Sequence, residues 1–143
     1  MNKLTLKTMT KDPNLKIGHY VGEFISPGIG HILKSAGCDY VFFDMEHSGF
    51  SFETFKQVVR FFEAAEIPVI VRSPSKDYSV ISRLCDSGAE GIMVPMINNA
   101  REAKTIIQHM KYAPDGHRGV ALGIAHDNFA ISTMDVDERL RAG

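Results

Sequence analysis

At residues 40–49 the sequence runs Tyr40-Val41-Phe42-Phe43-Asp44-Met45-Glu46-His47-Ser48-Gly49. Its first four residues form a short uninterrupted apolar run, which is typical of a strand buried on both faces in a parallel sheet. The polar residues after the run predict a loop, and Ser51 suits the N-cap of a following helix. Apolar side chains then recur at helical spacing, at Phe55, Val58, Val59, Phe62 and Ala65. The segment therefore predicts one strand–loop–helix unit.

The same unit recurs on both sides of this segment. Further strands are expected over residues 17–24, 67–71 and 91–94. The residues expected to start or stop the intervening helices are Ser26, Gly37, Gly88 and Asn98. The four strands begin near residues 17, 40, 67 and 91, a spacing of 23 to 27 residues. Repeated βα units of this kind predict a parallel sheet with right-handed crossovers.

Two architectures contain such units. A (β/α)8 barrel needs about 250 residues, so 143 residues with four units supply half of one. The alternative is an open doubly wound sheet, but the Gly-x-Gly-x-x-Gly turn and the phosphate-binding loop that favour it are missing. We therefore expect an α/β fold made of the first four βα units of a TIM (β/α)8 barrel. This single partial TIM-barrel domain covers residues 1–143, with an N-terminal extension at 1–16, a long loop at 112–130 and a last helix at 132–141.

Charge and composition exclude several classes of protein. The chain has 16 Lys and Arg against 17 Asp and Glu, a net charge of −1, whereas nucleic-acid binders carry a basic excess. No apolar stretch approaches the ~20 residues that span a bilayer, and the first residues do not resemble a signal peptide. Two cysteines, Cys38 and Cys85, make no disulfide framework. We expect a cytoplasmic protein that binds neither nucleic acid nor membrane.

Polar side chains follow the second and third strands where these strands end. Ligands of parallel α/β folds bind at the carboxyl ends of the strands, and this rule selects Asp44, Glu46, His47 and Arg72. Histidine can accept a proton near neutral pH, and arginine can hold a carboxylate or an oxyanion. The set suits proton abstraction from a substrate that bears a carboxylate. A solvated loop histidine and a structural ion pair of Arg72 are the plainer interpretations.

Asp86 is an acid in an unusual place. It lies in the last turn of its expected helix, just before Gly88, where a negative charge opposes the helix dipole. Either another interaction retains it there, or it is a solvated surface residue.

Four blocks of sequence resemble one family in their order and spacing. They are Asp44-Met45-Glu46-His47, Val71-Arg72-Ser73-Pro74, Val94-Pro95-Met96 and Tyr112-Ala113-Pro114-Asp115-Gly116-His117-Arg118-Gly119-Val120. Through them, residues 15–130 are similar to the HpcH/HpaI aldolase family of metal-dependent (class II) pyruvate aldolases, such as 4-hydroxy-2-oxoheptanedioate aldolase and 2-dehydro-3-deoxyglucarate aldolase. The resemblance implies a TIM barrel, a homo-oligomer, and a carbon–carbon lyase that cleaves 2-oxo-4-hydroxy acids to pyruvate or a relative plus an aldehyde.

The same resemblance implies roles for single residues. His47 matches the catalytic base, Arg72 the residue that stabilises the transition state, and Asp86 an acid that raises the basicity of that histidine. The family uses a divalent metal (Mg, Mn or Co), held by a Glu and an Asp on the fifth and sixth strands. Those strands would follow residue 143, so the chain corresponds to the amino-terminal half and is expected to lack the metal ligands. Its expected partners are a small 2-oxo acid substrate and either further copies of itself or a complementing C-terminal half.

Two other functions fit the same residues. One is a non-catalytic half-barrel with a binding or structural role. The other is an independent open-sheet enzyme that uses His47 and Arg72 without a metal.

Overall fold

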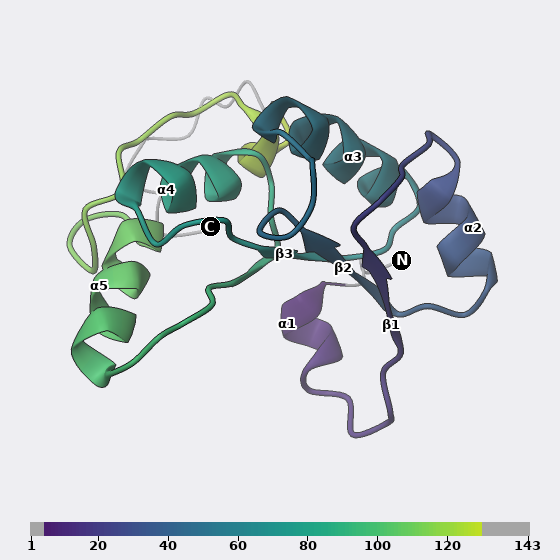
Figure 1. Cartoon of the computed structure of the whole chain (residues 1–143), viewed down its shortest axis with the longest axis horizontal. Coiled ribbons are helices and arrows are strands. Elements are labelled where there is room, and N and C mark those ends of the chain that lie inside the picture. The colour runs from purple at the N-terminus through teal and green to yellow at the C-terminus, as the bar shows by residue number, and fades with distance from the viewer. Residues whose placement is uncertain (1–4, 130–143) are drawn as a thin grey trace.

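The computed structural model describes residues 5–129. Helices and strands alternate along the chain (Figure 1). The elements are α1 (Leu6–Met9), β1 (Gly18–Val21), α2 (Ile29–Ser35), β2 (Tyr40–Asp44), α3 (Phe52–Ala64), β3 (Val69–Arg72), α4 (Tyr78–Asp86), β4 (Gly91–Met93), α5 (Ala100–Met110) and the 3-10 helix η1 (Ala125–Asp127). No helix in this part of the chain is long and apolar enough to cross a membrane. The helix expected over residues 132–141 lies outside the described residues.

All four strands form one parallel sheet in the order β1-β2-β3-β4. Each strand pairs with its neighbours in sequence, whereas a doubly wound sheet reverses its strand order partway. Figure 1 shows α2 to α5 along one side of the sheet and α1 on the other. This is the arrangement of the first four βα units of a (β/α)8 barrel. The half-barrel prediction is therefore confirmed, and the open doubly wound alternative is wrong.

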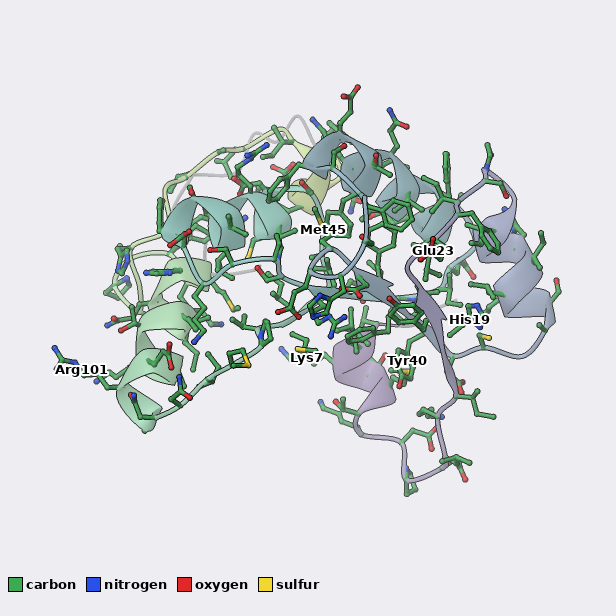
Figure 2. All side chains as sticks on the ribbon, in the orientation of Figure 1. Lys7, His19, Glu23, Tyr40, Met45 and Arg101 are labelled. Carbon is green, nitrogen blue, oxygen red and sulfur yellow. The ribbon has the colours of Figure 1, made fainter. Side chains whose placement is uncertain are left out.

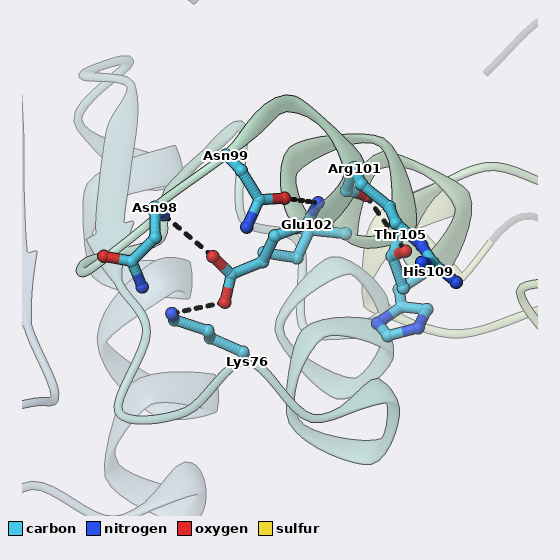
Figure 3. A pocket seen from close by; sticks show the side chains of 8 residues that line it. Lys76, Asn98, Asn99, Arg101, Glu102, Thr105 and His109 are labelled. Carbon is cyan, nitrogen blue, oxygen red and sulfur yellow. Dashed lines mark hydrogen bonds and ion pairs between the residues drawn. The ribbon is translucent and has the colours of Figure 1, made fainter.

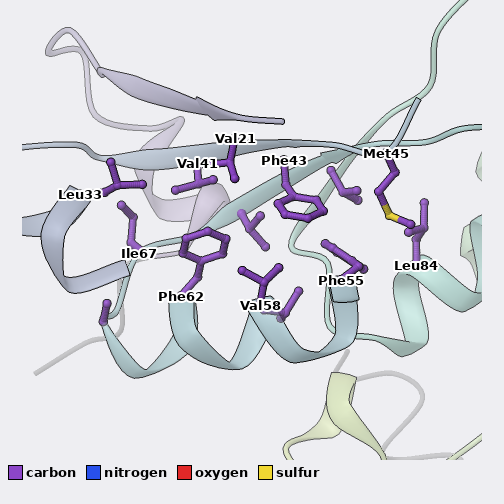
Figure 4. Close-up of a cluster of buried hydrophobic side chains, with 14 residues drawn as sticks. Val21, Leu33, Val41, Phe43, Met45, Phe55, Val58, Phe62, Ile67 and Leu84 are labelled. Atoms are coloured by element: carbon purple, nitrogen blue, oxygen red, sulfur yellow. The ribbon is translucent and has the colours of Figure 1, made fainter. Parts of the chain in front are cut away.

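The hydrophobic core fills the space between the sheet and its helices (Figure 4). On the two central strands, the residues on this side are each at most 2 % exposed, and they are Val41, Phe43, Val69 and Val71. The facing stripe of α3 is the one that the sequence predicts, with full burial of Phe55, Val58, Val59 and Phe62. Burying a large apolar side chain contributes ~1.5–3 kcal/mol. The α3 stripe is thus a main attachment of the helix layer to the sheet.

Alternate strand residues point to the opposite side of the sheet, which is the interior side in a barrel. Strand register aligns one layer of residues across all four strands: Tyr20, Phe42, Ile70 and Gly91. The next layer toward the carboxyl ends consists of Asp44, Arg72 and Met93. The polar residues of the interior side therefore gather at the carboxyl edge, above an apolar and aromatic layer.

Helix α1 lies against the start of β4 on the interior side. The backbone N–H of Leu6 donates to Glu90 Oε2 at 3.2 Å, and a Cβ added at Gly91 would lie 2.7 Å from Leu6 Cδ1. Gly91 therefore leaves the space that the Leu6 side chain fills. Figure 2 shows Tyr40 on this same side of the sheet and Met45 on the helix-covered side. The stretch predicted as an N-terminal extension thus contributes a short helix that covers part of the interior side.

Several helix ends confirm the residues predicted for them. Ser51 accepts a hydrogen bond from the backbone N–H of Thr54 at 3.1 Å and is the N-cap of α3. Gly37 and Gly88 follow α2 and α4 with φ values of 87° and 94°. Glycine adopts this left-handed conformation without steric cost, which explains why the helices end there. Cys38 and Cys85 are free thiols.

Two predicted helix starts are wrong by one or a few residues. The N-cap of α5 is Asn99, whose side chain accepts from the backbone N–H of Glu102 at 2.9 Å, and not Asn98. Helix α2 begins at Ile29, because the Ile29 N–H first closes a turn on the carbonyl of Ser26 at 3.1 Å. Asn98 and Asn99 carry nearly the same capping pattern in the sequence, so the choice between them depends on the path of the loop. The N-cap of α2 is Gly28, which makes no side-chain capping hydrogen bond.

Candidate active site

Asp44 organises the carboxyl edge of the sheet. It ends β2, it is fully buried, and the register places it opposite Arg72 at the end of β3. Arg72 donates twice to the carboxylate, from Nε to Oδ1 at 2.8 Å and from Nη2 to Oδ2. Tyr20 of β1 donates its hydroxyl to Asp44 Oδ2 at 2.8 Å. One carboxylate thus ties together three adjacent strands.

The loop after β2 folds back onto the same carboxylate. The backbone N–H groups of Glu46 and His47 donate to Asp44 Oδ1 at 2.9 and 3.3 Å. The Ser48 hydroxyl donates to the Asp44 carbonyl at 2.6 Å. An aspartate that accepts from the backbone two residues ahead stabilises a tight turn. This turn is the local reason why Glu46 and His47 stand at the strand end.

The hydrogen bonds also fix the charges of the site. The Arg72 guanidinium, helped by the Tyr20 hydroxyl and the two backbone N–H groups, holds the pKa of Asp44 well below its usual range despite burial. The Asp44 carboxylate in turn raises the pKa of Arg72 and, by accepting its hydrogen bond, the pKa of Tyr20. At neutral pH Asp44 is an anion, Arg72 a cation and Tyr20 a neutral phenol. None of the three is suited to accept a proton in a reaction near neutral pH.

Glu46 joins the guanidinium to the imidazole. Its Oε2 lies 3.3 Å from Arg72 Nε and 3.6 Å from His47 Nε2. The Glu46 side chain is 22 % exposed, whereas that of His47 is 70 % exposed. The structure therefore brings His47 and Arg72 together through Glu46, as the sequence predicts for adjacent strand ends. His47 is the group of this cluster that a substrate can reach most freely.

Asp86 lies in a different environment. It ends α4 and forms an ion pair with Arg118, with Oδ1 2.5 Å from Nη2. The Arg118 side chain is 8 % exposed, and its guanidinium carbon lies 4.7 Å from the centre of the Tyr112 ring. This contact joins α4 to the loop after α5 and explains why an acid is kept at the end of a helix. The effect of Asp86 on His47 stays a prediction.

A second polar cluster supports the loop between β4 and α5 (Figure 3). Lys76 donates to Glu102 Oε1 at 2.6 Å and also to the carbonyl of Met96, which has a left-handed φ of 60°. The backbone N–H of Asn98 donates to Glu102 Oε2 at 2.8 Å. That bond and the Lys76 ammonium lower the pKa of Glu102. The cluster thus holds a strained loop in place beside the Arg72 edge.

Tyr20 is the site residue that the sequence did not predict. Nothing in its neighbourhood along the chain marks it, because its polar partner lies 24 residues later, on the next strand. The signal that could have found it is strand alternation: Tyr20 pairs with Phe42, so it shares a face with Asp44 two residues further on. Using that signal requires the register, which the sequence alone left open.

Residues 5–129 contain no group of three or more His, Cys, Asp or Glu side chains that could hold a metal ion. The Asp44 oxygens accept hydrogen bonds from Arg72, Tyr20 and the loop backbone, and Glu46 Oε2 lies between a guanidinium and an imidazole. The donor set described here therefore does not fit a divalent cation.

A parallel half-barrel with polar side chains at its carboxyl edge is the architecture of (β/α)8-barrel proteins, whose sites lie at the carboxyl ends of the strands. Residues 23–136 match the model of the HpcH/HpaI aldolase/citrate lyase family, and the chain belongs to this family. The family expected from the four sequence blocks is thereby confirmed.

Characterised relatives and solved structures agree with this assignment. The hydroxypyruvate/pyruvate aldolase of Roseovarius nubinhibens is 28% identical over 121 residues, which are 85% of this chain and 47% of the relative. The pyruvate aldolase of Rhizobium etli is 33% identical over 104 residues, 73% of this chain and 38% of the relative. The crystal structure of an HpcH/HpaI aldolase from Desulfitobacterium hafniense superposes with a TM-score of 0.86 at 29% identity, covering 97% of this chain and 52% of that one. The chain thus spans about half the length of these relatives or less.

Proposed function

We propose that this chain carries the base and the guanidinium of a carbon–carbon lyase that cleaves 2-oxo-4-hydroxy acids to pyruvate or a relative plus an aldehyde. The observation that carries the proposal is the Asp44–Arg72–Glu46–His47 chain of contacts at the carboxyl ends of β2 and β3. Membership of an aldolase/citrate lyase family and relatives named as pyruvate aldolases support it. We assign His47 the role of base, Arg72 that of transition-state stabiliser, and Asp86 a supporting effect on the basicity of His47.

The proposed reaction follows from these roles. His47 accepts the proton of the substrate 4-hydroxyl, the C4–O bond becomes a carbonyl, and the C3–C4 bond breaks. The electron pair of the C3–C4 bond moves into a C2–C3 double bond, which leaves an enolate. Protonation of this enolate at C3 gives the 2-oxo acid. Negative charge passes from the 4-oxygen to the 2-oxygen, and the fixed guanidinium of Arg72 is suited to stabilise both. Asp44 keeps that guanidinium charged and in place.

The charge balance of the site suggests why this chemistry needs a further group. Two carboxylates, Asp44 and Glu46, contact the single guanidinium of Arg72. The cluster is therefore net negative while His47 is neutral, which disfavours an anionic substrate by itself. The divalent metal (Mg, Mn or Co) expected for the family would supply the missing positive charge for a 2-oxo acid. Its ligands would come from outside residues 5–129.

The proposal includes a partner that completes the site, either further copies of the chain or a complementing C-terminal half. The test is aldol cleavage of a 4-hydroxy-2-oxo acid, with pyruvate release followed through lactate dehydrogenase and NADH. It is run on the 143-residue chain alone and together with the carboxyl-terminal half of a relative. Metal-dependent release that disappears in both His47→Ala and Arg72→Ala supports the proposal. Full activity in either variant contradicts the role of that residue. If the 4-hydroxy-2-oxo acid binds but is not cleaved, either by the chain alone or with the carboxyl-terminal half, the non-catalytic half-barrel is favoured.

A further inference from the structure

Tyr20 reaches the site from β1, one layer below Asp44 and Arg72. Its hydroxyl donates to Asp44 Oδ2 at 2.8 Å, and the same oxygen accepts from Arg72 Nη2. Tyr20 as a whole is 53 % exposed, so burial of its ring is not what holds it there. A hydrogen bond to a charged acceptor is stronger than one between neutral groups. The hydroxyl contact is therefore a main restraint on this side chain and on the oxygen that it meets.

Tyr20 and Arg72 also contact the same aromatic ring. Tyr20 stacks on Phe42 with centroids 6.3 Å apart and an interplanar angle of 23°. The guanidinium carbon of Arg72 lies 6.0 Å from the Phe42 centroid. Phe42 and Asp44 are alternate residues of β2 and share the interior side. Tyr20, Asp44, Arg72 and Phe42 thus form a closed ring of contacts, in which the phenol and the guanidinium share both a carboxylate and an aromatic neighbour.

The backbone beside the phenol leaves room for its hydroxyl. A Cβ added at Gly22 would lie 2.3 Å from Tyr20 Oη, far inside van der Waals contact. Gly22 is not among the glycines with a positive φ, so its backbone conformation does not itself require glycine. The space taken by the Tyr20 hydroxyl accounts for the missing side chain.

From these contacts we propose that Tyr20 is a positioning residue for Arg72. Its hydroxyl holds the Asp44 carboxylate in the orientation from which both oxygens grip the guanidinium, and so keeps Arg72 in one orientation toward the 2-oxo acid. This role rests on the proposed function of Arg72. Tyr20→Phe removes the hydroxyl and retains the ring that stacks on Phe42. Tyr40→Phe is the matched control, because Tyr40 lies on the same side of the sheet (Figure 2) and a Cβ added at Gly18 would lie 2.3 Å from its ring.

The first measurement is solvent exchange of the Arg72 Nε–H, followed by nitrogen-15 NMR of the 143-residue chain. This N–H donates to Asp44 Oδ1 with an Nε–Oδ1 distance of 2.8 Å, so its exchange rate reports the strength of the hydrogen bond between Arg72 and Asp44. We expect exchange to rise about tenfold in Tyr20→Phe, the effect of losing one hydrogen bond to a charged group, and to stay unchanged in Tyr40→Phe. Circular dichroism verifies that both variants are folded. Unchanged exchange in a folded Tyr20→Phe overturns the proposal.

The second measurement is kcat and KM for aldol cleavage in the combination that completes the barrel. Tyr20→Phe should lower kcat about tenfold with a smaller change in KM, because a loosened guanidinium stabilises the transition state less. Tyr40→Phe should change neither constant. A wild-type kcat in Tyr20→Phe refutes the positioning role. Absence of cleavage in the wild type contradicts the proposed function instead, and the exchange measurement then decides the role of Tyr20.

Discussion

Replacing Asp44 by Asn should destabilise the fold and make its stability less dependent on pH. The substitution keeps the shape of the side chain, so it creates no cavity. The asparagine keeps one oxygen, which can still accept from the N–H groups of Glu46 and His47. Its NH2 group replaces the other oxygen and faces the Arg72 guanidinium or the Tyr20 hydroxyl, which are themselves donors. Arg72 then loses the buried half of its ion pair.

The size of the effect follows from the burial of the two partners. Breaking a buried, hydrogen-bonded ion pair costs about 3–5 kcal/mol. Asp44 is fully buried, but the Arg72 side chain is 21 % exposed and keeps Glu46 at 3.3 Å. We therefore expect a loss of about 2–3 kcal/mol in the free energy of unfolding at pH 7. For a domain of this size that corresponds to a decrease in Tm of about 10 °C.

The pH dependence has a definite sign. The pKa of Asp44 in the fold lies below its ordinary value of 3.8, so the unfolded chain binds more protons at this group than the folded chain. The stabilisation by Asp44 is therefore fully present above about pH 5 and decreases as the pH falls through 4 toward the lowered pKa. Because Asn does not titrate, the stability difference between the wild type and Asp44→Asn should shrink over the same range.

Urea unfolding followed by circular dichroism at pH 7, 5, 4 and 3 measures both effects. Asp115→Asn is the control, because Asp115 is exposed and makes no hydrogen bond within residues 5–129. It should leave the midpoint unchanged at pH 7. A stability loss in Asp44→Asn that is the same at pH 7 and pH 3 would refute the role given to the carboxylate charge. No loss at all would refute the stabilisation assigned to the Asp44–Arg72 ion pair.

In the completed barrel, His47→Ala should lower the rate of aldol cleavage by about 10²–10⁴ and Arg72→Ala by about 10²–10³, measured as coupled pyruvate release. Asp86→Asn should have a milder effect on cleavage and should lower Tm through the loss of its Arg118 contact; an effect as large as that of His47→Ala would make it a central residue. Calorimetric titration of the chain alone with Mn²⁺ or Mg²⁺ should show no stoichiometric site, and micromolar binding would contradict this. Sedimentation equilibrium of the chain alone should show species above the monomer mass of 15.9 kDa, because β1 and β4 are open edges in the described sheet. A single 15.9 kDa species with a cooperative thermal transition would be the contrary result.

The elements of the fold were largely predictable because their signals are local. The apolar run before Asp44, the Ser51 cap and the glycines at 37 and 88 each act within a few residues of the chain. The half-barrel followed from the repetition of such units. Helix starts were less predictable. Asn98 and Asn99 have the same side chain, and only the path of the loop decides that Asn99 accepts from the Glu102 N–H.

The site was predictable only in part because its contacts are not local. Arg72, Glu46 and His47 could be predicted to lie near one another because the carboxyl ends of adjacent parallel strands meet at one edge of the sheet. The interaction of Tyr20 with Asp44 depends on which residues of β1 and β2 stand side by side, and a shift of one residue would move Tyr20 to the helix side. The contact of Asp86 with Arg118 spans 32 residues and includes a loop without regular structure, so no spacing rule predicts it.

Sequential strand pairing also sets the order in which the site can fold. The Tyr20–Asp44 contact closes a segment of 24 residues and the Asp44–Arg72 contact one of 28 residues. Short closures cost little chain entropy, so contacts of this kind form early and quickly. On a ribosome, where the amino-terminal part emerges first, the charged edge can assemble once β3 has left the exit tunnel, before α4 and α5 are available. The contacts that join Tyr20, Asp44 and Arg72 can thus form in the emerged part of a nascent chain while α4 and α5 are still inside the tunnel.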